Sequence, residues 1–341
     1  MGKPTYILIS IRKGCLELIE RDLYEQYRLN NSGFFKYRNF QAFYENRSLY
    51  VIVPIPQIER EELLELKQMS DYLQFQKEDR MAHFVPTVTQ ELIGFINGES
   101  IALFKIPNIN QRKLLSDGED LARFHNLGRY YPYPPQTATR LGLWKTMWEN
   151  RLDQLEEWWA QRIHGLPENR FEKLFFETFQ YYLGVSENAI QYVADCMWED
   201  NRKEAQIGTI CYVKYKPQTD SDRVIFPTDL IFDHPTRDLA EWIRSKYVTG
   251  TDMQEIRNFL NQYERITPLS TVSSRLLFGR LLFPLTYFEA VEGYYSASSE
   301  KQKMKYEKQF FRVVDQAEDY ERFLSTLFKI PEIEWLQSIK G

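Results

Sequence analysis

Side chains able to do acid–base, nucleophilic or metal chemistry are few in this sequence, and they are widely spaced. The three cysteines show neither a CxxC pair nor the even count of a disulfide framework, and the four histidines show no HxH or HxxxH spacing. These residues are Cys15, Cys196, Cys211, His83, His125, His164 and His234. We therefore expect no metal site, and the cysteine pattern favours a reducing compartment.

Three acids lie close together between residues 229 and 238. Pro227 and Pro235 frame Asp229 and Asp233 in a segment that we expect to be a loop with solvent-facing acids. Asp238 begins an Asp-Leu-Ala run typical of a helix start, where a carboxylate accepts backbone N–H bonds. We assign Asp238 a structural role as the cap of that helix.

The elements that position these residues belong to a chain of 341 residues, long enough for about two domains. Hydrophobic residues make up 43%, charged residues 27% and aromatic residues 15%, which excludes a disordered or low-complexity protein. A net charge of -5 and a pI near 5.6 argue against a dedicated nucleic-acid binder. The apolar run at residues 6–11 predicts a strand, not a signal peptide, and no run is long enough to span a membrane, so we expect cytoplasmic synthesis.

Short strands and one long helix are expected in the first 106 residues. Aromatic and β-branched runs at 34–37, 40–44 and 49–53 predict antiparallel strands. Apolar residues near period 3.6 predict a helix at 58–76. An Asn-Gly turn at 97–98 predicts a second hairpin, formed by 95–96 and 101–104.

Residues after 107 are expected to be mainly helical. The pattern predicts helices at 114–127, 141–164, 168–183 and 186–203, strands at 207–215 and 223–226, and helices again from 238 onwards. A capping box is expected at 251–254. We interpret the stripe of tryptophans from Trp144 to Trp159 as core packing, and His125 as a packed, hydrogen-bonded residue of its helix.

Two motifs resemble those of one known family. Residues 118–125 read GEDLARFH, and residues 233–244 read DHPTRDLAEWIR. They are similar to the LAxFH and PxRDLAxxxR helices of the CotS-type spore-coat kinase-like family, a branch close to the aminoglycoside and choline phosphotransferases. The resemblance covers nearly the whole chain and implies an α+β, two-lobed protein-kinase-like fold. Its β-rich N-terminal lobe would span 1–106, and its helical C-terminal lobe 107–341, with a degenerate catalytic loop at about 208–233.

The resemblance also implies where catalytic residues should lie in the larger lobe. Residues 211–215, CYVKY, occupy the place of a Cys-His-Gly-Asp loop, so Tyr212 stands for the histidine and Lys214 for the catalytic base. Thr219 stands where an asparagine would hold Mg²⁺, and Phe226 stands where an aspartate would do so. A phenyl ring carries no oxygen for Mg²⁺, and an ammonium cannot accept a proton as the carboxylate would.

The small lobe shows the same losses. Val53 stands at the position of the family's phosphate-binding lysine, and Gly33 alone does not make a glycine-rich loop. Lys36 on a neighbouring strand is interpreted as a solvated lysine, although it could reach a phosphate instead. We therefore expect no catalytic, cofactor-binding or metal-binding residues, and a structural role for Asp238 alone.

The resemblance implies a pseudokinase that is made in the mother cell, is deposited on the bacterial spore coat, and has other coat proteins as partners. Two alternatives stay open at this point. An active small-molecule phosphotransferase would use Asp229 or Asp233 in a shifted register. A nucleic-acid-binding module would stack bases on aromatic side chains, which the charge balance disfavours. We expect no cofactor and no membrane insertion.

Overall fold

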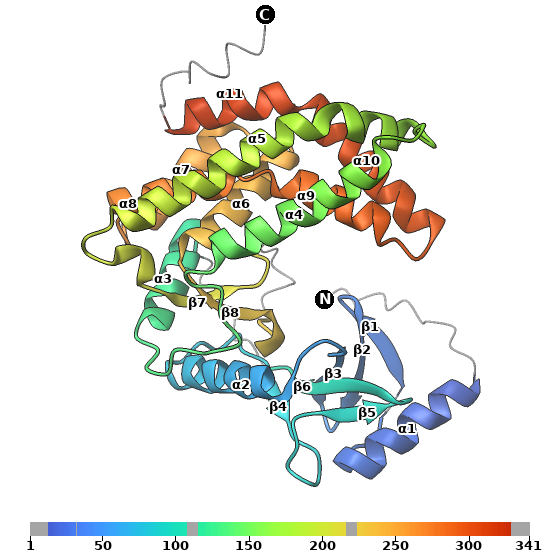
Figure 1. Cartoon of the computed structure of the whole chain (residues 1–341). Helices are drawn as coiled ribbons and strands as arrows, with labels where there is room; N and C mark the ends of the chain where they lie inside the picture. Colours follow the sequence, from blue (N-terminus) through green and yellow to red (C-terminus); the bar gives the residue numbers. More distant parts are fainter. Residues whose placement is uncertain (1–12, 32, 108–114, 216–223, 329–341) are drawn as a thin grey trace, which may run out of the picture. The chain divides into compact units, whose positions relative to one another are not determined.

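The computed structural model describes residues 13–31, 33–107, 115–215 and 224–328 of the chain (Figure 1). Contacts divide the chain into two compact units. The first comprises residues 1–115, 123–139 and 209–232, and the second comprises residues 116–122, 140–208 and 233–341. Residues 123–139 and 209–232 thus group with the N-terminal elements, and the lobe boundary at 106 stays a prediction.

An antiparallel six-stranded sheet forms the centre of the first unit, with strand order β1-β2-β3-β6-β4 and β5 also paired with β6. The strands are β1 Phe34–Tyr37, β2 Phe40–Glu45, β3 Ser48–Pro54, β4 His83–Val85, β5 Gly94–Ile96 and β6 Glu99–Lys105. Asn46, Arg47, Asn97 and Gly98 all have positive φ, which is the conformation of the tight turns that join twisted hairpins. Both hairpins expected from the sequence are confirmed.

Helix α1, Lys13–Tyr27, packs on this sheet. Ile19, Leu23 and Tyr27 join a buried cluster with Phe43 and Tyr50 of the neighbouring strands. The sequence analysis did not anticipate this helix, and the strand expected at 6–11 lies outside the described residues. Helix α2, Arg60–Phe75, buries its apolar stripe as the 3.6 period predicted.

The remaining elements of the middle of the chain are short. Helix α3 spans Asp117–Arg129, the 3-10 helices are η1 Glu204–Gln206 and η2 Pro227–Asp229, and strand β7 Thr209–Tyr212 pairs with β8 Leu230–Asp233. Residues 223–226 were expected to form a strand. Their described part forms only a single parallel bridge, between Ile225 and Met81, because Pro227 follows at once and starts η2.

Helices make up the second unit. They are α4 Trp144–Arg162, α5 Arg170–Trp198, α6 Thr236–Val248, α7 Met253–Glu264, α8 Thr271–Leu282, α9 Leu285–Tyr295, α10 Glu300–Asp315 and α11 Ala317–Phe328. The prediction of two helices, at 168–183 and 186–203, is wrong, because α5 is one continuous helix. Ser186 lies inside the helix, and its hydroxyl donates a hydrogen bond to the Tyr182 carbonyl at 2.6 Å. It therefore does not cap a new helix.

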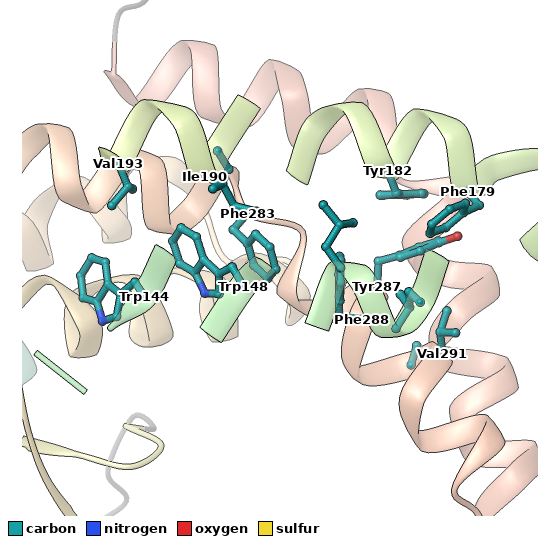
Figure 2. Packing of buried hydrophobic residues seen from close by; sticks show 14 of the residues in the cluster. Trp144, Trp148, Phe179, Tyr182, Ile190, Val193, Phe283, Tyr287, Phe288 and Val291 are labelled. Atoms are coloured by element: carbon teal, nitrogen blue, oxygen red, sulfur yellow. The ribbon is translucent and has the colours of Figure 1, made fainter. Parts of the chain in front are cut away.

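Aromatic side chains fill the core of this unit (Figure 2). Trp144 and Trp148 of α4 are buried, and the Trp148 ring stacks on Phe283 with 4.4 Å between centroids. Trp158 and Trp159 pack against the same core while partly exposed. The tryptophan stripe is therefore core packing, as predicted.

The start of α7 differs by one residue from the expected capping box. The N-cap is Asp252, whose side chain accepts a hydrogen bond from the Gln254 backbone N–H at 3.3 Å. Within the described ranges, no helix combines the length and the apolar character needed to cross a bilayer.

Candidate functional site

Strand β7 carries the segment that the resemblance aligns with a catalytic loop. Tyr212, at the position of the loop histidine, is buried and stacks on Phe124 of α3, with ring centroids 4.6 Å apart. Tyr215 is also buried, and its ring centroid lies 5.1 Å from that of Tyr212. Lys214, at the position of the base, is exposed. The segment therefore presents packed rings and an ammonium where acid–base catalysis would need a carboxylate.

Close backbone packing holds α3 against β7. A Cβ on Gly128 would lie 2.5 Å from the Ile210 backbone nitrogen, so only glycine permits this approach. The Thr209 hydroxyl donates to the His125 carbonyl at 2.6 Å, and Cys211 Sγ lies 4.0 Å from His125 Nε2. His125 and Cys211 are both fully buried. His125 is thus a packed side chain of α3, as the sequence analysis interpreted it.

Phe226 occupies the position where the resemblance places an Mg²⁺-binding aspartate. Its side chain is only 1% exposed and meets three other rings edge to face. The centroid distances are 6.5 Å to Tyr37, 5.9 Å to Phe40 and 5.5 Å to Phe104. Because these rings come from β1, β2 and β6, the position belongs to the apolar core of the first unit.

Arg38, in the turn between β1 and β2, joins this ring cluster to Asp229. Its guanidinium donates to the Val224 carbonyl at 2.5 Å, lies 5.0 Å from the Phe226 ring centroid, and comes within 3.8 Å of Asp229 Oδ2. The same Asp229 oxygen accepts the Phe226 backbone N–H at 3.3 Å. The Asp229 side chain is 47% exposed, as expected, but it faces a cation.

The position of the phosphate-binding lysine is apolar. Val53 is 4% exposed and pairs with Ala102 across the β3–β6 ladder. Lys36 is exposed on β1 opposite Gln41, as its interpretation as a solvated lysine required. Gly33 has a φ of +113° in the residues before β1. Thr219 lies outside the described residues.

Asp233 is buried, and the expectation that it faces solvent is wrong. It ends β8, a strand buried along its whole length, and its side chain is 0% exposed. Trp144 Nε1 lies 3.0 Å and 2.9 Å from the two carboxylate oxygens, the His234 backbone N–H donates to Oδ1 at 2.7 Å, and Arg237 Nη1 lies 3.1 Å from Oδ2. The indole comes from 89 residues earlier in the chain, which no local pattern could have indicated.

Charge balance around this carboxylate comes from Arg237. Burial alone lowers the pKa of Arg237, but the neighbouring carboxylates of Asp233 and Asp238 outweigh burial and raise the pKa above its usual value. The arginine therefore stays charged and lies as a cation beside these two carboxylates.

Asp238 is fully buried, but it does not cap the helix. Helix α6 begins at Thr236 with Pro235 as its N-cap, so Asp238 lies at the third position of the first turn. The prediction of a helix beginning at Leu239 is wrong, because the proline already starts the helix. A carboxylate in the first turn is still favoured by the positive end of the helix.

Replacing Asp238 by alanine is expected to lower the free energy of unfolding by about 0.5–3 kcal/mol, because a buried carboxylate beside the Arg237 charge and in the first turn of α6 is removed. Lys214→Ala is expected to change it by less than about 0.5 kcal/mol, as most exposed substitutions do. Urea unfolding of both variants provides the measurement. A neutral Asp238→Ala beside a strongly destabilising Lys214→Ala would show that the family alignment is misplaced.

Other residues of the two motifs have structural roles in the second unit. Asp117 accepts the Trp242 indole N–H at 3.1 Å, and a Cβ on Gly118 would lie 2.3 Å from the Phe259 carbonyl oxygen. Arg244 is buried, donates to the Arg280 carbonyl at 2.7 Å and lies 3.2 Å from Glu241. These contacts explain the glycine and the arginine of the motifs without catalysis.

A second buried arginine adds to this cluster of charges. Arg280 of α8 lies 4.6 Å from the Trp144 ring centroid and 3.6 Å from Glu241. Burial, together with the charge of Arg237, lowers the pKa of Arg280 to about 10. It remains a cation at neutral pH, so the surroundings of Asp233 are rich in fixed positive charge.

Glu65 of α2 has a role that the sequence analysis missed. Its carboxylate accepts hydrogen bonds from the backbone N–H groups of Gln136, Thr137 and Ala138, at 2.7 Å, 2.9 Å and 2.7 Å, and from the Thr137 hydroxyl at 2.6 Å. Burial raises the pKa of Glu65, but these hydrogen bonds outweigh burial and lower it. No local sequence pattern indicated this contact, because the donors lie 71 to 73 residues after Glu65.

Comparison with known proteins decides the family. The model of the family described as spore coat putative kinase YutH matches residues 20–327. The chain belongs to this family. It is also 38% identical, over 335 residues, to the endospore coat-associated protein YutH of Bacillus subtilis strain 168, covering 94% of this chain and 98% of that protein.

Solved structures place this YutH-family chain in a wider fold group. An aminoglycoside phosphotransferase from Alicyclobacillus acidocaldarius matches with a TM-score of 0.65 at 14% identity, covering 96% of this chain and 97% of that one. The AMP-bound spectinomycin phosphotransferase APH(9)-Ia matches with a TM-score of 0.61 at 12% identity, covering 93% and 99%. The α+β, two-lobed kinase-like fold implied by the motifs is thereby confirmed.

Proposed function

We propose that this protein is a catalytically inactive kinase-like protein of the bacterial spore coat, and that it acts there by binding other coat proteins. Its family and its relative from Bacillus subtilis, which is coat-associated, support the location. The observation that carries the proposed inactivity is Phe226, buried among Tyr37, Phe40 and Phe104 at the position of a metal-binding acid.

An apolar residue in place of a metal-binding acid argues against phosphoryl transfer, because that reaction depends on bound metal. Mg²⁺ requires oxygen ligands in near-octahedral geometry, and metal and lysine charges supply most of the stabilisation of the transferred phosphoryl group. Val53 and Phe226 supply neither. Loss of the catalytic base by itself typically costs about 10²–10⁴ in rate.

An active phosphotransferase with a shifted register is the second candidate, because Asp233 ends a strand of a two-stranded sheet directly before helix α6. Binding a cation there would require Asp233 to give up contacts with Trp144 and Arg237. Asp229 would have to release Arg38, although that pair is partly exposed and costs little to break. Breaking the buried pair of Asp233 and Arg237 is costly, and this favours the inactive protein.

Mg²⁺ and ATP are expected to leave the melting temperature unchanged. A nucleotide present at 100 times its dissociation constant would stabilise the protein by about 2.7 kcal/mol, which a thermal melt detects easily. The measurement compares ATP with and without Mg²⁺ on the full chain. A metal-dependent rise that disappears in Asp233→Asn would overturn the proposal and support the shifted register.

A fluorescent fusion is expected to accumulate on the developing spore of a sporulating host rather than throughout the mother cell. The physical reason is that a coat protein without enzymatic turnover acts by occupying a site on the coat. Time-lapse microscopy through sporulation gives the measurement. Uniform mother-cell fluorescence at every stage would contradict the proposed location.

A further inference from the structure

The second unit contains a mainly apolar pocket that the proposed function does not use. Helices α5, α6, α10 and α11 and the turn between α8 and α9 line it, and its volume is about 100 Å³. The rings of Tyr182 and Tyr287, stacked with 3.7 Å between centroids, line it from α5 and α9 (Figure 2). Val185, Phe283 and Leu324 add further apolar surface.

The size of this pocket limits what it can hold. Protein interiors are close-packed, and voids larger than a water molecule are few. An engineered apolar cavity of about 150 Å³ binds benzene. This pocket has about two-thirds of that volume but opens to solvent, so it accepts one aromatic ring or a short alkyl chain that extends into its mouth. Its aromatic walls favour the ring.

Polar side chains with unused hydrogen-bonding capacity line the same pocket, and each of them can donate. Arg312 of α10 is exposed and makes no side-chain hydrogen bond or ion pair with any residue that the structure describes. Gln316 and Thr286 line the pocket too, and their side chains likewise have no hydrogen-bond partner in the described ranges. A ligand group that accepts hydrogen bonds and carries negative charge fits this set.

Several other polar groups of the lining already have hydrogen-bond partners. Glu321 accepts the Tyr181 hydroxyl, and the Tyr182 hydroxyl donates to the Val313 carbonyl at 3.3 Å. The Tyr320 hydroxyl donates to a backbone carbonyl of α8 at 2.8 Å. The pocket's carboxylate is therefore occupied, while Arg312 is available.

We propose that this pocket binds a small carboxylate that carries one aromatic ring or a short alkyl chain. The apolar part lies against Tyr182, Tyr287 and Val185, and the carboxylate meets Arg312 at the mouth. This site is independent of the kinase-like catalytic positions, so it stands whether or not the protein is an enzyme.

Isothermal titration calorimetry of the full chain with phenylacetate tests the proposal. We expect saturable binding at one site, weaker binding of the neutral phenylacetamide, and no binding of benzylamine. Arg312→Gln is expected to weaken phenylacetate about tenfold and to leave phenylacetamide unchanged, because only the charged head uses the guanidinium. Arg322→Gln, which removes an exposed arginine of α11 that does not line the pocket, is the matched control and should change neither affinity.

Variants that fill the pocket with a larger side chain provide a second, independent test. Val185→Phe is expected to abolish binding of phenylacetate and of phenylacetamide. If that variant does not fold, Leu324→Phe on α11 is used in its place, with the same expected result. The absence of saturable phenylacetate binding to the unmodified protein would overturn the proposal. So would phenylacetate binding that survives a folded filled variant, or that is as tight in Arg312→Gln as in the unmodified protein.

Discussion

Replacing Arg237 by methionine is expected to destabilise the protein by about 3–5 kcal/mol, the usual cost of leaving a buried charge without its partner. Arg237 Nη1 lies 3.1 Å from Asp233 Oδ2, and the Asp233 side chain is completely buried. Methionine keeps the length and the apolar contacts of the arginine stem but removes the charge, so the loss is electrostatic. Urea unfolding at neutral pH measures it.

A matched exposed ion pair tests whether this loss is electrostatic. Arg322→Met, which removes the cation of an exposed pair with Asp319, should cost less than about 0.5 kcal/mol. Equal effects of the two substitutions would contradict a role for Arg237 in neutralising Asp233.

Local signals explain why the sheet was predictable from the sequence. The hairpins depend on turn residues at fixed positions, Asn46-Arg47 and Asn97-Gly98, and on β-branched or aromatic runs beside them. The single long helix α5 was not predictable in this way. Serine is common at the start of a helix, so Ser186 was compatible with a new helix there. In the structure Ser186 lies inside α5, and its hydroxyl donates to the Tyr182 carbonyl one turn earlier.

Some residues of the candidate site could likewise be located from the sequence, whereas the contacts of others could not. The resemblance located Val53 and Phe226 and indicated that neither could hold a phosphate or a metal, and the structure places both in the apolar interior. The surroundings of Asp233 could not be predicted, because its partner Trp144 lies on another helix and proline framing favours an exposed loop. The hydrogen bonds of Glu65 were missed for the same reason, since the backbone N–H groups that donate to its carboxylate lie 71 to 73 residues away.

Introducing the missing acid, Phe226→Asp, is expected to destabilise the protein by more than about 4 kcal/mol and to confer no Mg²⁺-dependent nucleotide binding. Deleting a buried aromatic side chain costs about 3–5 kcal/mol, and an ionised carboxylate in its place would be buried in a cluster of aromatic rings. Arg38 lies 5.0 Å from the Phe226 ring centroid, but its guanidinium already donates to the Val224 carbonyl and faces Asp229. Thermal melts with and without Mg²⁺ and ATP give both readouts.

Phe226→Leu separates loss of the ring from gain of the charge, because leucine keeps an apolar side chain at the position. We expect it to cost about 1–2 kcal/mol, well below the cost of the acid. If Phe226→Asp instead folds with nearly unchanged stability and gains a metal-dependent shift with ATP, the position would still be a functional metal site that lacks only its ligand. The rings of Tyr37, Phe40 and Phe104 would then be replaceable packing around that site, and the proposed inactivity would depend on a single side chain rather than on a repacked core.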